Sequence, residues 1–188
     1  MENIFKAARL NASTSEDADL AKVVHSDESA FAEIYSRYSL RIYRYVYNRV
    51  GDMAGAEDLT SQVFLDALEH IDNYRPNGSF AAWLFTIARR RSVDYFRHSH
   101  PNQSLEDDQV SINPDVLEQI IKKEERTRLI KIIQSLDNDD QELLRLRYAA
   151  GLSFLDIAAV LNRTPASVKM AFYRLIEKIK QIMEDSND

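Results

Sequence analysis

The chain has 188 residues, with 24 basic and 30 acidic side chains, a formal net charge of −6, four histidines and no cysteine. The lack of cysteine excludes disulfides, thiolate metal sites and cysteine nucleophiles, and the scattered histidines show no metal-ligand spacing, so no metal or other cofactor is expected. No segment reaches the apolar length of a membrane span and the first residues show no signal-peptide pattern, so we expect no membrane insertion and a cytoplasmic location. With only four glycines and four prolines among many good helix formers, the composition predicts an all-α protein.

Helical periodicity organises the first half of the chain. Apolar residues recur at helical spacing over residues 27–50. The stripe expected to face the core contains Phe31, Ile34, Tyr35, Tyr38, Ile42, Tyr45 and Val46. A second helix follows, and turn-forming residues at 73–78 separate it from a third helix over residues 79–98. From these helices we expect one small helical domain over residues 20–98, preceded by a flexible tail over residues 1–19.

Residues 99–115 are expected to form a flexible acidic linker, because they contain two prolines, four acidic residues, no basic residue and no sustained apolar period. A second small helical domain is expected over residues 116–188. Residues 20–98 contain ten basic and ten acidic residues, and residues 116–188 contain twelve of each. The negative excess therefore lies in the tail and the linker, and the net charge does not exclude a nucleic-acid partner.

The segment from Ser153 to Arg174 predicts two short helices joined by a tight turn. Ser153 and Asp156, three residues later, have the spacing of a capping box at the start of the first helix. Thr164 followed by Pro165 marks the start of the second helix. This pattern is typical of a helix-turn-helix, whose second helix enters the major groove of DNA.

On a helical wheel, the second helix of this motif has two distinct faces. The stripe expected to face the core contains Val168, Phe172, Leu175, Ile176 and Ile179. The opposite face holds groups suited to base edges, flanked by cations where phosphates would lie. The residues expected to contact an upstream DNA element are Arg163, Thr164, Ser167, Lys169, Met170, Tyr173, Arg174 and Lys178. The alternative is an ordinary helical hairpin with a solvated face.

The arginine run in the third helix does not form one patch on the wheel. Arg89, Arg90 and Arg97 share a polar face and are candidates for DNA contacts. Arg91 lies beside the apolar stripe, where we expect it either to extend its charged end to solvent or to pair with a carboxylate. Trp83 lies at the border of the stripe, so both packing in the core and stacking on an unpaired base remain open.

Taken in order along the chain, these segments resemble a bacterial RNA polymerase sigma factor of the extracytoplasmic-function (ECF) group. Residues 56–64 are similar to the polymerase-docking helix of that family, residues 80–97 to its promoter-melting segment, and residues 136–182 to the domain that reads the minus-thirty-five element. The resemblance covers nearly the whole chain. It implies a subunit without a catalytic site of its own that binds core RNA polymerase and directs promoter-specific transcription initiation.

The resemblance also implies roles for individual residues. The polymerase-binding residues it implies are Glu57, Asp58, Ser61 and Gln62, and the minus-ten residues are Asn77, Trp83, Arg89, Arg90 and Arg97. Without the resemblance, the acidic pair of the docking helix would be interpreted as a solvated face. The chain departs from the family pattern at Gln62, where an acid is usual, at Arg90, where asparagine is common, and at Ala171 and Ile176, where arginines are frequent.

The expected partners are core RNA polymerase, promoter DNA and an anti-sigma protein that hides the DNA-facing surfaces. Two other functions remain open. A stand-alone helix-turn-helix regulator would dimerise, and residues 169–183 offer a short seam for that purpose. A sigma-like decoy would bind an anti-sigma protein and no DNA, which the departures from the family pattern favour. An enzyme is the least favoured class, because the sequence shows no nucleophile–base pair, phosphate-binding glycine loop or metal cluster.

Overall fold

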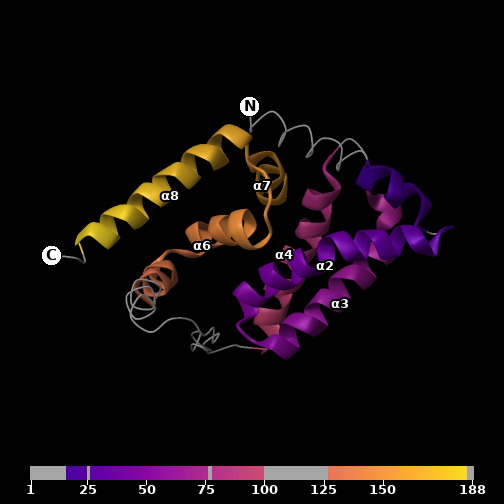
Figure 1. Ribbon diagram of the computed structural model, residues 1–188, viewed down its shortest axis with the longest axis horizontal. Helices are drawn as coiled ribbons and strands as arrows, with labels where there is room; N and C mark the ends of the chain where they lie inside the picture. Colours follow the sequence, from indigo (N-terminus) through magenta and orange to yellow (C-terminus); the bar gives the residue numbers. More distant parts are fainter. Residues whose placement is uncertain (1–15, 25, 76–77, 100–126, 186–188) are drawn as a thin grey trace, which may run out of the picture.

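The computed structural model describes residues 16–24, 26–75, 78–99 and 127–185, and every regular element in these ranges is a helix (Figure 1). The all-α prediction is confirmed. The elements are α2 (Glu28–Val50), α3 (Met53–Glu69), η1 (Ile71–Asn73), α4 (Phe80–Ser99), α6 (Asn138–Leu144), η2 (Arg145–Ala149), α7 (Phe154–Leu161) and α8 (Pro165–Asp185). Figure 1 shows an N-terminal group (α2, α3 and α4) beside a C-terminal group (α6, η2, α7 and α8). No described helix combines the length and the apolar character needed to cross a bilayer.

The turn between α2 and α3 takes only two residues. Gly51 ends α2 with φ = 77°, a left-handed conformation that favours glycine. Asp52 then caps α3 by accepting a hydrogen bond from the backbone N–H of Gly55 at 2.6 Å. So short a connection folds α3 back along α2, which brings the apolar stripes of the two helices together.

Large side chains from α2 and α4 fill the core of the N-terminal group. Ile42, Tyr45, Leu84 and Phe85 are all fully buried. The ring of Tyr45 packs edge-on against that of Phe85, with 5.7 Å between ring centroids. Because burying each large apolar side chain contributes about 1.5–3 kcal/mol, these contacts fix α4 against α2.

Tyr35 does not belong to the core stripe, so its predicted burial was wrong. The residue is 45% exposed, and its ring lies over the edge of α3 with 4.7 Å between its centroid and that of Phe64. Tyr35 follows the buried Ile34 directly, and one residue turns a helix by about 100°. The tyrosine therefore faces the rim of the α2–α3 contact.

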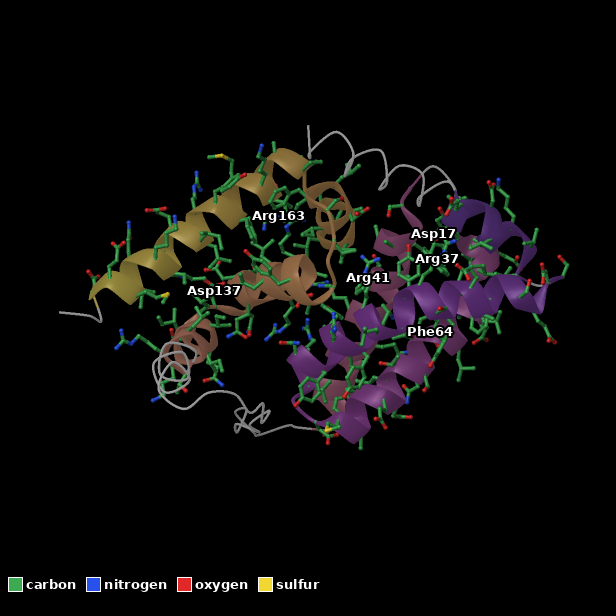
Figure 2. All side chains as sticks on the ribbon, viewed as in Figure 1. Asp17, Arg37, Arg41, Phe64, Asp137 and Arg163 are labelled. Carbon is green, nitrogen blue, oxygen red and sulfur yellow. The ribbon has the colours of Figure 1, made fainter. Side chains whose placement is uncertain are left out.

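The segment before α2 is folded, which corrects the boundary of the predicted flexible tail. Residues 1–15 lie outside the described residues, but residues 16–23 are helical. Asp17 is buried, accepts a hydrogen bond from the hydroxyl of Tyr38 and accepts another from Nη1 of Arg37 at 2.8 Å (Figure 2). Burial, followed by the hydrogen bond to Asp17, raises the pKa of Tyr38. Residues 16–19 thus belong to the N-terminal group.

Residues 100–126, which include most of the predicted linker, lie outside the described residues. The described part of the C-terminal group starts with a helical segment over residues 127–135. Asp137 caps α6 by accepting a hydrogen bond from the backbone N–H of Asp140 at 2.8 Å. Helix α6 continues directly into η2, a π-helical turn closed by a 2.9 Å hydrogen bond from the N–H of Ala150 to the carbonyl of Arg145.

The predicted helix-turn-helix is present in α7 and α8. Ser153 and Asp156 form the expected capping box, with reciprocal side-chain to backbone hydrogen bonds of 3.1 and 3.2 Å. Asn162 ends α7 at φ = 52°, a left-handed conformation that asparagine tolerates well. Thr164 then caps α8 by accepting a hydrogen bond from the N–H of Ser167 at 3.2 Å.

Replacing Asp17 with alanine is expected to lower the free energy of unfolding by about 1–3 kcal/mol, because the buried hydroxyl of Tyr38 loses its acceptor. Asp19 provides a matched control: it is exposed and pairs with Lys22 at 2.7 Å, and its replacement should change the free energy by less than about 0.5 kcal/mol. Urea-induced unfolding followed by circular dichroism measures both variants. Equally small changes would contradict a specific role for the buried carboxylate.

Candidate nucleic-acid interface

Helix α8 lies on the outer edge of the molecule, away from the N-terminal group (Figure 1). One face of this helix is exposed. Met170 and Tyr173 are 55% and 56% exposed. Lys169 and Arg174 are exposed beside them, and Nζ of Lys169 lies 5.9 Å from the centroid of the Tyr173 ring. This face therefore presents apolar, aromatic and cationic groups together at the second and third turns of the helix.

The opposite face of α8 is buried, as its apolar stripe predicts. Val168, Phe172, Leu175 and Ile179 are buried, and Ile176 packs against the core with part of its surface exposed. The Phe172 ring contacts the Phe154 ring of α7, with 5.3 Å between centroids. Packing on one side only fixes the orientation in which α8 presents its outer face.

Two of the residues predicted to contact DNA, Thr164 and Ser167, cap the start of α8. Arg163 is exposed in the turn before the helix. The hydroxyl of Thr164 accepts the capping hydrogen bond, and the hydroxyl of Ser167 donates to the Thr164 carbonyl at 2.9 Å. These two hydroxyls hold the first turn in position.

Lys178 is engaged elsewhere. Its Nζ donates a hydrogen bond to Oδ2 of Asp140 in α6 at 3.0 Å and lies 3.9 Å from Oδ2 of Asp137. The hydrogen bond to Asp140 raises the pKa of Lys178. This lysine therefore connects α8 to α6, whereas its position on the helical wheel predicted a contact with a DNA phosphate.

The three consecutive arginines of α4 have three different environments. Arg91 donates two hydrogen bonds to Asp66 of α3, so pairing with a carboxylate is the alternative that the structure shows, and these bonds raise the pKa of Arg91. The side chain of Arg90 is 86% exposed, with Nε 4.0 Å from Asp94. Nε of Arg89 lies 3.3 Å from Oε1 of Glu142 in α6, so Arg89 reaches toward the C-terminal group, with 42% of its side chain exposed. Asn77 and the side chain of Arg97 lie outside the described residues.

Trp83 belongs to an aromatic cluster at the start of α4. Its ring centroid lies 5.6 Å from that of Tyr74 and 5.4 Å from that of Phe80. The residue is partly buried and packs against the core. Of the two alternatives from the sequence, packing describes this arrangement.

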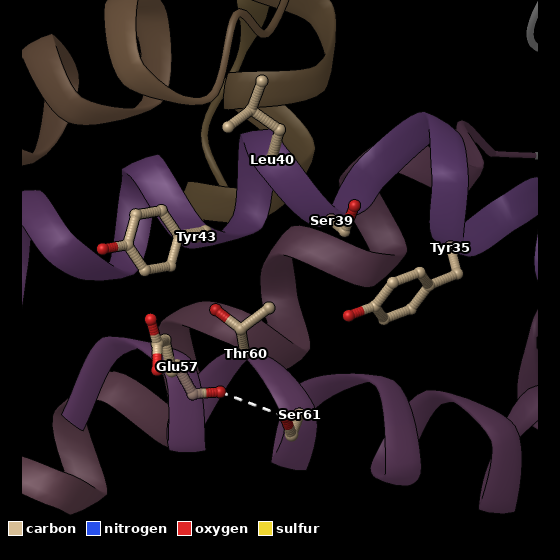
Figure 3. Close-up of a pocket in the computed structure, with 7 residues that line it drawn as sticks. All are labelled: Tyr35, Ser39, Leu40, Tyr43, Glu57, Thr60 and Ser61. Carbon is tan, nitrogen blue, oxygen red and sulfur yellow. Dashed lines mark hydrogen bonds between the residues drawn. The ribbon is translucent and has the colours of Figure 1, made fainter. Parts of the chain in front are cut away.

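The residues expected to dock on polymerase lie on an open face of α3. Glu57, Asp58 and Ser61 are exposed, and Nε2 of the half-buried Gln62 donates to Oδ2 of Asp58 at 2.7 Å. Next to them, a hollow of about 310 Å³ opens between α2 and α3 (Figure 3). Its lining consists of Tyr35, Ser39, Leu40, Tyr43, Glu57, Thr60 and Ser61.

Sequence reasoning did not find the α2 side of this hollow. Leu40 is 55% exposed and Tyr43 is half-buried, although both are hydrophobic. The available signal was that these two residues fall outside the core stripe of α2. Over the described ranges, no group of three or more His, Cys, Asp and Glu side chains is placed to hold a metal ion.

Comparison with known proteins relates both helical groups to one family. The family model of Sigma-70 region 2 matches residues 34–100, and that of Sigma-70 region 4 matches residues 126–179. The ECF RNA polymerase sigma factor BldN of Streptomyces coelicolor is 31% identical, over 94% of this chain and 70% of that protein. The chain belongs to the ECF group of RNA polymerase sigma factors.

Further comparisons agree with this membership. The ECF RNA polymerase sigma factor SigK of Mycolicibacterium vanbaalenii is 31% identical over 87% of each protein. The solved structure of CnrH in complex with the cytosolic domain of CnrY has the same fold, with a TM-score of 0.65 and 19% identity over 92% of this chain and 97% of that one. In this ECF sigma factor, the region 2 match contains α3, α4 and most of α2, and the region 4 match contains α6, η2, α7 and α8 up to Ile179.

Proposed function

We propose that this ECF sigma factor binds core RNA polymerase and directs promoter-specific transcription initiation. One observation carries the DNA-binding part: the outer face of α8 is exposed, while its other face is buried in a capped helix-turn-helix. We assign polymerase docking and minus-ten recognition to the N-terminal group, and recognition of the upstream element to the C-terminal group. Residues 99–115 are assigned as the linker between the two groups.

Docking on polymerase is assigned to the outer face of α3 and the hollow beside it. The hollow offers exposed apolar surface from Leu40 and Tyr35, and Glu57 and Asp58 add negative charge next to it. The matching partner is a helical segment with an apolar side chain for the hollow and basic side chains for the acidic pair. Gln62 supplies no charge, but its amide holds Asp58 in position.

The protein supplies recognition and no chemistry of its own in this proposal, because the polymerase makes the RNA. Its place of action is then the cytoplasm. An anti-sigma protein that covers α3 or the outer face of α8 would silence the factor, since each surface serves one required step.

The two alternatives are weaker. A stand-alone dimeric regulator would need the apolar stripe of α8 as its seam, but Phe172 and Ile179 of that stripe are already buried within the chain. A decoy that binds no DNA would have no use for the exposed Lys169, Arg174 and Arg90. Run-off transcription separates all three functions: purified chain plus core polymerase should give discrete transcripts from genomic fragments that core polymerase alone does not give. No transcripts, together with tight sequence-specific binding by the free chain, would support the regulator. No transcripts and no DNA binding would support the decoy.

Arg174→Ala should weaken binding of the holoenzyme to its upstream element by about 1–3 kcal/mol, because a bidentate contact to a base edge would be lost. Lys169→Ala should instead weaken binding to all sequences alike and reduce the salt dependence, as expected for a phosphate contact. Footprinting at several salt concentrations, on the upstream element and on a scrambled duplex, measures both. The same loss on both duplexes for both variants would contradict the division into base and phosphate contacts.

Arg90→Asn should shift the base preferred at one minus-ten position and leave polymerase binding intact. Arginine offers only hydrogen-bond donors, which suit an acceptor-rich base such as guanine, whereas asparagine offers a donor and an acceptor. Promoters selected from a library randomised at the minus-ten element, with wild-type and variant holoenzymes, report the preference. An unchanged preference with uniformly lower activity would mean that Arg90 contacts a phosphate.

A further inference from the structure

A carboxylate is buried where the C-terminal group meets the N-terminal group. The side chain of Glu142, in α6, is 6% exposed. Its Oε1 accepts a hydrogen bond from the hydroxyl of Tyr45 at 2.7 Å, and its Oε2 accepts one from Nη1 of Arg49 at 2.5 Å. Both donors belong to α2. Glu142 is therefore bound by the other half of the molecule.

Two more guanidinium groups reach the same carboxylate. Nε of Arg89, in α4, lies 3.3 Å from Oε1 of Glu142, and Nη1 of Arg145 lies 3.6 Å from Oε2. Burial lowers the pKa of Arg145, and Glu142 partly offsets this effect. Three arginines thus surround one negative charge. Two of them, with the Tyr45 hydroxyl, remain on the N-terminal group if the two groups separate.

The contact between the groups extends beyond this cluster. Nε of Arg41 donates to the carbonyl of Ala150 at 2.8 Å, and its guanidinium lies 5.1 Å from the ring centroid of Tyr38 and 5.6 Å from that of Phe85 (Figure 2). Helix α7 packs along α4. The helix assigned to promoter melting is therefore covered along one side by the first helix of the helix-turn-helix.

Glu142 leaves one hydrogen-bond donor of the arginine cluster without an acceptor. Among the described residues, Nε of Arg89 is buried without a hydrogen-bond partner, although it lies 3.3 Å from Oε1 of Glu142. A phosphodiester is the same class of ligand as a carboxylate: a monoanion whose charge is shared by two oxygens. Arginine guanidinium groups and the tyrosine hydroxyl donate hydrogen bonds to both. DNA that approaches α4 would bring such groups to Arg89.

We propose that Tyr45, Arg49 and Arg89 form a binding site for a DNA phosphate, which Glu142 occupies in the free chain. The described arrangement is then a closed form, in which the C-terminal group competes with DNA for this site and covers α4. Polymerase binding draws the two groups apart and frees the site for promoter DNA. The proposal rests on the proposed function, since it assumes that α4 meets DNA.

Glu142→Gln in the full chain tests this exchange. Loss of the charge should open the chain and raise its affinity for a short fluorescent duplex by about tenfold in the absence of polymerase, because apparent affinity follows the fraction of binding-competent molecules. Glu184→Gln, an exposed residue in the last turn of α8, changes the net charge equally and should change the affinity less than about twofold. Equal affinities for the two variants would overturn the proposal.

Two further variants separate opening from binding. Arg41→Lys keeps the charge but loses the stacked guanidinium and its hydrogen bond, so it should also raise DNA affinity, and it serves if Glu142→Gln does not fold. Adding Arg49→Gln to Glu142→Gln should abolish the gain in affinity. A double variant that binds DNA as tightly as Glu142→Gln would overturn the phosphate site.

Run-off transcription keeps this proposal distinct from the proposed function. Glu142→Gln with core polymerase should give the same transcripts as wild type, because the closed form has already opened in the holoenzyme. Absence of transcripts from wild type would count against the proposed function, while the affinities of the free variants would still decide whether Glu142 closes the chain.

Discussion

Burial of the Glu142 carboxylate is the constraint on which the arrangement of the two helical groups depends. A buried charge is tolerated only where hydrogen bonds and opposite charges compensate its lost hydration. Here most of the compensation comes from α2 and α4, in the other group, and Arg145 of the same group adds to it. The same junction sets η2 against α2 and α7 against α4, and Arg145 adds a hydrogen bond to the carbonyl of Asn48 at 3.1 Å. Removing one partner therefore affects the whole junction.

This junction divides the surface of the sigma factor into hidden and open parts. The outer face of α8, the outer face of α3 and Arg90 are exposed. Arg89 and one side of α4 face the C-terminal group. In the proposed function, the open surfaces can make first contacts with polymerase and DNA, whereas the hidden side of α4 becomes available only when the groups part. In this proposal, the fold orders the steps of recognition.

Local patterns predicted most of the helices and the buried and exposed faces of α8. Periodicity located α2 and α4, and cap chemistry located the start of α7 and α8. The helical wheel placed Arg91 beside the apolar stripe, where pairing with Asp66 needs only a neighbouring helix. The incorrect predictions depend on contacts between distant segments. Residues 16–19 are ordered by Tyr38 and Arg37, and Arg89 by a carboxylate 53 positions later, for which no local pattern exists. No local sequence pattern predicted the π-helical turn either.

A distance between the two groups, in the free protein and after addition of core polymerase, tests the central claim most directly. The chain contains no cysteine, so cysteines introduced at Glu69 in α3 and Gln181 in α8, both exposed, take a unique pair of spin labels. We predict one narrow distance distribution in the free chain that lengthens when core polymerase binds, and a long component already in free Glu142→Gln. A distance that core polymerase leaves unchanged, or a broad distribution identical in wild type and Glu142→Gln, would contradict a closed form held by Glu142.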